Sequence, residues 1–415
     1  MDADSMMPSS NPPRGGTASE VLAVFLKLGL SSFGGPVAHL AYFRREFVER
    51  RRWLDDEAYS DLVGLCQFLP GPASSQVGFS IGLLRAGWLG GLAAWLGFTL
   101  PSALLLIAFA ALAPGLGGPL GEGLVHGLKL VAVAVVAQAV WDMARRLCPD
   151  RRRAFIALAT LALLAVLRTV YAQLIVIALG AALGLLLCRG ATSPGTNRRQ
   201  LHADAFRVSR RAGGIALLLF CVLLAGLPAL APSTPSASRA LSVFDGFYRS
   251  GALVFGGGHV VLPLLQQQTV ATGWVSPNAF LAGYGAAQAV PGPLFTFAAF
   301  LGWIMPAAPN HWAGALLATL GIFLPGLLLV LAALPYWQAW RARPAMAAVF
   351  AGVNAAVVGL LASALYSPVW TSAVSASIDF AVAAIGFFLL ARWKIPPLAV
   401  VLLGALAGLA EAVLR

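Results

Sequence analysis

Two glycine- and proline-rich interruptions lie inside apolar runs of the sequence and could bind an anion. The first is Phe33-Gly34-Gly35-Pro36, and the second is Pro70-Gly71-Pro72. Proline removes a backbone donor and glycine weakens a helical turn, so neither run can form one regular helix. The N-terminus of a half-helix presents unpaired N–H groups and the positive end of a dipole, and both favour negative charge. A kink or a close helix contact is the structural alternative.

Both interruptions recur about 220 residues later, which favours a binding site over a single kink. Phe255-Gly256-Gly257-Gly258 repeats the first break, and Pro291-Gly292-Pro293 repeats the second. Hydroxyl, amide and imidazole side chains surround all four breaks. The substrate-binding residues that we expect are Lys27, Ser31, Ser32, Gly34, Gly35, His39, Gln67, Pro70, Gly71, Pro72, Ser74, Ser75, Gln76, Arg249, Gly256, Gly257, His259, Gln288, Pro291, Gly292, Pro293 and Thr296.

Two cations precede the glycine breaks at equivalent positions. Lys27 and Arg249 each lie about two turns before a break. An intramembrane cation is costly and marks a substrate path or an ion pair. Asp245 lies four residues before Arg249, so an ion pair is the alternative there. We expect both cations to attract an anion, Lys27 more strongly. His39 and His259 are candidates for proton coupling, with a hydrogen-bonded structural role as the alternative.

The composition excludes a soluble protein. The chain has 415 residues, of which 59% are hydrophobic and 11% charged, and its mean hydropathy is +0.81. Soluble domains contain about 45–50% apolar and about 25% charged residues. The apolar runs are continuous instead of alternating, so they predict membrane-spanning helices in a lipid bilayer. The net charge of +12 is explained by an excess of lysine and arginine in the cytoplasmic loops of such a protein. Nucleic acid is therefore not an expected partner.

No motif indicates catalysis. The sequence has no nucleophile elbow, no HExxH and no P-loop, so we expect neither an enzyme nor a cofactor. Its four cysteines show no close pairing and no histidine at metal-ligand spacing, so we expect no disulfide framework and no metal.

Thirteen apolar segments predict an all-α polytopic fold of about 12–13 transmembrane or broken helices. They lie at 20–40, 58–84, 87–113, 120–144, 154–167, 171–188, 213–231, 240–264, 278–304, 311–337, 344–364, 375–391 and 395–414. The charged stretch 41–57 between the first two predicts an interfacial helix.

The second half of the chain repeats the first. KLGLSSFGGPVAH at 27–39 matches RSGALVFGGGHVV at 249–261, and GWLGGLAAWLGFTLP at 87–101 matches HWAGALLATLGIFLP at 311–325. Later matches include Gly180 with Gly404 and Gly184 with Gly408, and the offset stays between 221 and 224. Such a duplication is common in transporters, whose sites lie between the repeats.

The duplication predicts a domain plan. We expect a disordered tail at 1–19, homologous halves at 20–188 and 240–415, and a basic linker at 189–239 that contains a connecting helix at 213–231. An odd connecting helix would invert one half relative to the other. The arginines of 41–52 then violate the positive-inside rule, so the residues alone leave parallel halves open. We favour inverted halves, with 41–57 and 265–277 on opposite faces.

Residues 27–78, KLGLSSFGGPVAHLAYFRREFVERRRWLDDEAYSDLVGLCQFLPGPASSQVG, resemble the N-terminal signature of the chromate ion transporter family. VFGGGHVVLPLL and AQAVPGP in the second half resemble its C-terminal signature. The resemblance implies an inner-membrane carrier that exports chromate from the cytoplasm, driven by the membrane potential or a proton gradient, and confers chromate resistance. It also implies two inverted halves. Gly258 stands where the first half has Pro36, so the halves need not contribute equally.

Two other functions stay open at this point. Sulfate or another oxyanion would suit the same donors, because sulfate and chromate are tetrahedral dianions of similar size. A membrane-embedded sensor or scaffold is a different class, but it has no need of broken helices. The expected partners are the anion and the lipid bilayer, with a homodimer as an open alternative.

Overall fold

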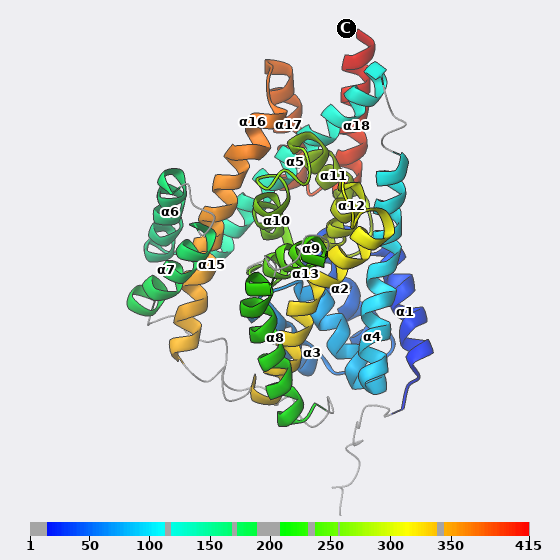
Figure 1. The fold of residues 1–415 in the computed structure, drawn as a ribbon, viewed down its shortest axis with the longest axis vertical. Helices are drawn as coiled ribbons and strands as arrows, with labels where there is room; N and C mark the ends of the chain where they lie inside the picture. The colour runs from blue at the N-terminus through cyan, green and yellow to red at the C-terminus, as the bar shows by residue number, and fades with distance from the viewer. Residues whose placement is uncertain are drawn as a thin grey trace, which may run out of the picture.

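The computed structural model describes residues 15–112, 118–167, 172–188, 208–230, 237–255, 258–337 and 344–414. Within these ranges every regular element is helical, which confirms the predicted all-α class (Figure 1). Five helical stretches are long and apolar enough to cross a membrane. They are α4 (Ala73–Leu112), α5 (Gly118–Leu147), α8 (Arg210–Leu230), α13 (His311–Ala333) and Ala345–Ala373.

The two halves contain equivalent helices in the same order along the chain. The first half contains α1 (Ala18–Ser31), α2 (Gly35–Phe43), η1 (Arg44–Arg50), α3 (Asp56–Phe68), α4, α5, α6 (Arg151–Val166) and α7 (Ala172–Leu187). The second contains α9 (Ala237–Ala252), η4 (Gly258–Val260), α10 (Val261–Thr269), α11 (Pro277–Ala289), η5 (Leu294–Thr296), α12 (Phe297–Ile304), α13, η6 (Leu334–Tyr336), α15 (Pro344–Ala364), η7 (Leu365–Trp370), α16 (Thr371–Ala373), α17 (Ser377–Ala391) and α18 (Pro397–Leu414).

Four of the predicted apolar segments are broken, at the glycine and proline positions that the sequence singles out. The segment 20–40 divides into α1 and α2 at Gly34, whose φ is +99°. The breaks between α3 and α4 and between α11 and η5 fall at the two Pro-Gly-Pro loops. Gly256 and Gly257, in the break between α9 and η4, lie outside the described residues. The predicted segments 58–84 and 87–113 meet within α4 at a kink, where Ala86 and Gly87 have non-helical torsions.

The first helices of the two halves pack in the same way. α1 lies along α4, and α9 lies along α13. Gly29 and Gly251, which the sequence aligns, allow these close approaches. A Cβ on Gly29 would lie 2.7 Å from the carbonyl oxygen of Gly97, and one on Gly251 would collide with that of Ile322. The structure therefore uses the aligned glycines for equivalent helix crossings.

The C-terminal helical pairs are exchanged between the halves. α6 and α7 of the first half pack on α15 of the second, while α17 and α18 of the second half pack on α5 of the first. Small residues line both crossings: Gly184 contacts Gly352, and Gly408 contacts Gly123. Glycine lets helix backbones approach closely in a membrane. Each half therefore completes its packing with helices from the other.

The charged stretch 41–57, for which we expected an interfacial helix, is helical up to Arg50 and then forms a charged turn that leads into α3. The helix continues from α2 through the π-helical turn η1, ends at Arg50, and α3 begins only at Asp56. Arg44 pairs with Glu49 at 2.6 Å and with Asp56 at 2.7 Å. Because these pairs are half exposed, each adds little stability.

The predicted tail and linker lie mostly outside the described residues. The structure describes the chain from residue 15, and α1 already begins at Ala18, inside the predicted tail of 1–19. Residues 189–207 of the linker are not described. The predicted connecting helix 213–231 corresponds to α8, which packs on α9 and α13. The domain boundaries stay predictions.

We predict that the charged turn and its counterpart lie on opposite sides of the membrane. Residues 41–57 contain five arginines and 265–277 contain none, and the single connecting helix α8 would invert the second half. A membrane-impermeant maleimide should label Glu57→Cys and Ala271→Cys from opposite sides, because both side chains are exposed. The background is the chain with its native cysteines replaced, at Cys66, Cys148, Cys188 and Cys221.

Permeabilised cells are the control, since both positions should then react. Labelling of both cysteines from the same side of intact membranes would show that the halves are parallel.

Candidate functional site

A small cavity lies where the two halves meet. Its volume is about 20 Å³, which is room for about one water molecule. Every lining residue has its repeat equivalent, at an offset of 221–222, in the same cavity. The pairs are Pro36 with Gly258, Pro72 with Pro293, Ala73 with Leu294, and Ser74 with Phe295. A pseudo-two-fold axis therefore passes through the cavity.

Four helices begin at this cavity. α2 begins at Gly35, α4 at Ala73, the helix formed by η4 and α10 at Gly258, and the helix formed by η5 and α12 at Leu294. The first N–H groups of a helix have no partner within that helix. Each helix start also carries the equivalent of about half a positive charge. The described residues that line the cavity include no lysine or arginine, so its positive partial charge comes from the convergence of four helix starts.

Reciprocal backbone hydrogen bonds join the breaks of the two halves. The N–H of Gly71 donates to the carbonyl of Val254 at 2.7 Å, and the N–H of Gly292 donates to the carbonyl of Ser32 at 2.9 Å. Gly71 and Gly292 are equivalent in the repeat, as are Ser32 and Val254. Each Pro-Gly-Pro loop thus satisfies a carbonyl freed by the broken helix of the other half.

The middle position of each Pro-Gly-Pro loop requires glycine. Gly71 has φ +118° and Gly292 has φ +102°, a region that L side chains rarely adopt. A Cβ on Gly71 would lie 2.9 Å from the Cα of Gly326, and one on Gly292 would lie 2.8 Å from the Oγ of Ser102. Gly326 and Ser102 directly follow the aligned prolines of α13 and α4. Equivalent backbone segments therefore support both loops.

Gln76 strengthens the contact between the halves. Its side chain is fully buried, and its amide nitrogen donates to the carbonyls of Pro70 and Gly326, each at 2.9 Å. We expected Gln76 to face the substrate. In this structure its amide links the start of α4 to α13 by hydrogen bonds and does not line the cavity. Phe297 occupies the equivalent position and has no side-chain donor, so it cannot make these hydrogen bonds in the second half.

Ser74 is the one lining residue with a side-chain hydroxyl. It lies in the first turn of α4, and its Oγ is 3.4 Å from Nδ1 of the buried His39. The His39 ring packs edge-on against Phe98, with ring centroids 5.2 Å apart. The repeat equivalent of Ser74 is Phe295, so the polar wall of the cavity comes from the first half alone.

Several buried polar atoms near the breaks have no hydrogen-bond partner within the described part of the chain. They include the Oγ atoms of Ser32 and Ser75, the Nε2 atoms of His39 and Gln288, and the Oε1 of Gln76. Buried polar groups are normally hydrogen-bonded to protein or to ordered water. The open donors among them, next to four helix starts, are suited to a hydrated or partly hydrated anion.

The two predicted cations do not line the cavity. Lys27 is exposed on α1, because the buried face of this helix consists of other positions such as Val24, Phe25 and Leu28. Arg249 pairs with Asp245 at 2.9 Å within α9, which was the structural alternative. The positive field of the cavity therefore comes from helix starts and not from these side chains.

Other predicted ligands also point elsewhere. Ser31 is exposed and donates back to the carbonyl of Lys27, and Gln67 is exposed on α3. The Nδ1 of His259 lies 2.9 Å from the Tyr284 hydroxyl, away from the residues that line the cavity. The Thr296 hydroxyl donates to the Pro293 carbonyl at 2.7 Å.

The remaining expected residues lie in or beside the breaks. The residues Gly34, Gly35, Pro70 and Pro291 belong to the breaks, and Gln288 lies half-buried near the end of α11.

Several residues of the site carry no signal that predicts them from the sequence. Phe295, Leu294 and Ala73 line the cavity but offer no side-chain polar group. Val254 acts through its carbonyl, which no sequence motif distinguishes. Gly326 and its equivalent Ser102 could have been found from the repeat, since each follows an aligned proline.

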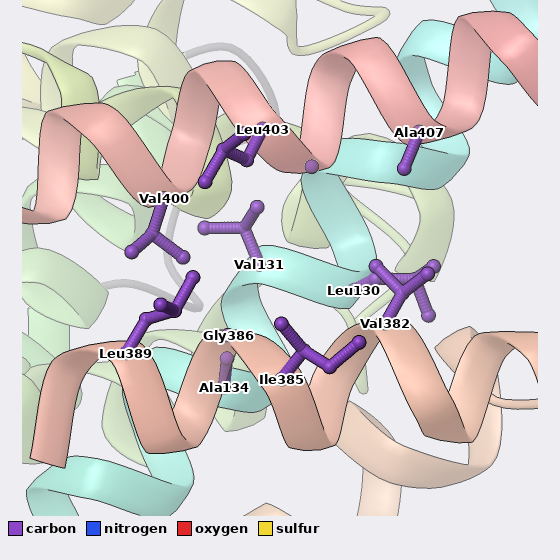
Figure 2. A pocket seen from close by; sticks show the side chains of 11 residues that line it. Leu130, Val131, Ala134, Val382, Ile385, Gly386, Leu389, Val400, Leu403 and Ala407 are labelled. Atoms are coloured by element: carbon purple, nitrogen blue, oxygen red, sulfur yellow. The ribbon is translucent and has the colours of Figure 1, made fainter. Parts of the chain in front are cut away.

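A larger cavity lies between α5, α17 and α18 and has a different chemistry (Figure 2). Its volume is about 180 Å³. All its lining residues are apolar or glycine: Leu130, Val131, Ala134, Val382, Ile385, Gly386, Leu389, Val400, Leu403, Gly404 and Ala407. It offers no side-chain donor to an anion, so the smaller cavity between the helix starts is the better candidate.

A family model described as chromate transporter matches residues 19–185 and, a second time, residues 241–409. The chain belongs to the chromate transporter family. The two matches confirm the internal duplication. No solved structure matches the chain.

Curated relatives cover most of the chain. It is 29% identical to a chromate transport protein of Pseudomonas aeruginosa, over 94% of this chain and 91% of the relative. It is 27% identical to a chromate transport protein of Cupriavidus metallidurans, over 84% and 82%. It is 25% identical to an uncharacterised transporter of Methanocaldococcus jannaschii, over 98% and 96%.

We predict that Gly292→Ala destabilises the protein. The added Cβ would force an L residue into the left-handed region and towards Ser102, and such strain costs about 1–3 kcal/mol. Thermal unfolding in detergent should show a lower melting temperature. Gly214→Ala on α8 is the matched control, because nothing lies within 4 Å of its added Cβ. Equal melting temperatures for both variants would contradict the role assigned to Gly292.

Proposed function

We propose that this chain exports chromate from the cytoplasm across the inner membrane as a secondary carrier and thereby confers chromate resistance. Membership of the chromate transporter family supports transport as the activity. Two relatives named chromate transport proteins support chromate as the substrate. The cavity between the halves supports this assignment because its chemistry fits a tetrahedral dianion.

The convergence of four helix starts carries the proposal. At about half a charge each, four starts together offer roughly two positive charges, which matches the charge of chromate. Backbone N–H groups at a helix start bind oxyanions directly. The Ser74 hydroxyl adds a side-chain hydrogen bond on one side of the cavity.

The cavity is closed in this structure. Its volume of about 20 Å³ holds one water, and a tetrahedral oxyanion is several times larger. The halves must therefore move apart to admit the anion. The contacts that such a motion would break are the bonds from Gly71 to Val254 and from Gly292 to Ser32. Rocking of two repeats about a fixed site is the usual route of alternating access in duplicated transporters.

The membrane potential supports export as the direction. Moving one elementary charge through 100 mV is worth about 2.3 kcal/mol. A dianion that leaves an interior-negative cell therefore gains about 4.6 kcal/mol per 100 mV. This gain can drive export without a coupling ion, whereas inward transport of the same dianion would need an additional source of free energy.

We predict that inside-out membrane vesicles containing the protein accumulate labelled chromate when their lumen is made positive. The potential draws the dianion into the lumen, which corresponds to the cell exterior. Valinomycin with potassium should abolish the uptake, and nigericin should abolish it only if a proton gradient contributes. Vesicles from cells that lack the protein are the control. The proposal fails if neither chromate nor sulfate enters the vesicles. Preferential uptake of sulfate would show that the protein is a carrier whose substrate is sulfate.

We predict that Ser74→Ala weakens chromate transport about tenfold or more. A hydrogen bond to a charged group is worth about 1.5–3 kcal/mol, and each 1.4 kcal/mol is about a factor of ten. The measurement is the concentration dependence of chromate flux per folded molecule. Ser31→Ala is the matched control, because that hydroxyl is exposed and bonds its own helix.

Lys27→Ala should retain more flux than Ser74→Ala, since Lys27 lies outside the cavity. A greater loss of flux in Lys27→Ala than in Ser74→Ala would show that Lys27 takes part in transport.

A further inference from the structure

Three titratable side chains that do not line the cavity between the halves form a cluster. They belong to α5, α17 and α18 (Figure 1). His126 is on α5, Asp379 is in the first turn of α17, and Glu411 is near the end of α18. The His126 Nε2 is 2.7 Å from Oδ1 of Asp379 and 3.8 Å from Oε2 of Glu411. One nitrogen and two oxygens lie within 4.8 Å of one another.

The cluster carries an excess of negative charge. One imidazole faces two carboxylates, and Glu122 lies one helical turn before His126 on α5. Lys129, one turn after His126, donates to the side-chain oxygen of Asn278 at 2.9 Å. Even a protonated His126 would therefore leave the cluster short of positive charge.

Hydrogen bonds hold the carboxylate of Asp379 in a fixed orientation. Its side chain is 1% exposed, and its Oδ2 accepts from the N–H groups of Ser375 and Ala376, each at 2.9 Å, and from the Ser375 hydroxyl at 3.0 Å. These bonds satisfy one oxygen and aim the other at His126. The side chains of His126 and Glu411 are 25% and 21% exposed, so the protein does not fully enclose the cluster.

We propose that His126, Asp379 and Glu411 bind a divalent transition-metal cation of the Zn²⁺ type. Zinc binds imidazole nitrogen and carboxylate oxygen at about 2.0–2.2 Å, and tetrahedral geometry then places the ligand atoms roughly 3.3–3.5 Å apart. The observed separations of 2.7 and 3.8 Å lie on either side of this range. One imidazole with two carboxylates is a donor set that suits zinc.

The metal would tie the two halves together. His126 comes from the first half, whereas Asp379 and Glu411 belong to the exchanged helices of the second. The apolar cavity of Figure 2 lies between the same three helices, so their side chains leave part of that space unfilled. A cation bound by all three helices would fix their spacing.

The site is specific to one of the two exchanged hairpins. At the offset of 224 that relates Gly180 to Gly404, Leu187 of α7 corresponds to Glu411 of α18. The other exchanged hairpin therefore packs without a carboxylate at the position of Glu411.

The test uses the purified full chain, freed of any affinity tag, treated with EDTA and dialysed. Equilibrium dialysis against Zn²⁺ should give about one bound ion per chain, and Zn²⁺ should raise the melting temperature. Loss of a residue that only orients a ligand costs about 10–100-fold in metal affinity, so Glu411→Gln and His126→Gln should each cost at least tenfold. His311→Ala is the matched control, because His311 is exposed and outside the cluster.

Asp379 also caps α17, so its substitution is not the primary variant. The proposal is overturned if the wild-type chain binds no Zn²⁺ stoichiometrically, or if Glu411→Gln and His126→Gln bind it as tightly as the wild type. In both cases the cluster is a His126–Asp379 ion pair that holds α5 to α17. These measurements do not involve anion flux, so their failure leaves the transport proposal intact.

Discussion

The structure depends on one constraint, which is that backbone groups released by a broken helix must find partners inside an apolar protein. The chain breaks four of its helical segments near the centre of the fold. The N–H of Gly71 and the carbonyl of Val254 satisfy each other, as do Gly292 and Ser32. Each half therefore relies on hydrogen-bond partners that the other half provides.

The same constraint explains how an anion site can exist without a cation in its lining. Breaking a helix costs hydrogen bonds, but it also turns a helix start towards the interior. Pro36 and Gly258, which are repeat equivalents, come into contact there. Four starts around one axis concentrate partial positive charge where side-chain cations would be costly. Because Ser74 faces Phe295 across the axis, the field is nearly symmetric while the hydrogen bonding is not.

The exchanged hairpins extend this mutual dependence to the outside of the fold. α6 and α7 pack on α15, and α17 and α18 pack on α5, through small residues in both places. The cluster of His126, Asp379 and Glu411 is one departure from this symmetry. Duplicated positions thus carry the scaffold, and the differences between the halves carry the specific chemistry.

The sequence alone determined the helical membrane class, the duplication, and the four breaks, because proline, glycine and continuous apolar runs act locally. It also marked Pro72, Ser74 and Pro293, which the cavity contains. Tertiary structure decided what spacing cannot express. Lys27 falls on the outer face of α1, and Gln76 bonds a carbonyl 250 residues away. The direction of a side chain and the partner of a carbonyl depend on which helices meet, and here the helices that meet belong to different halves.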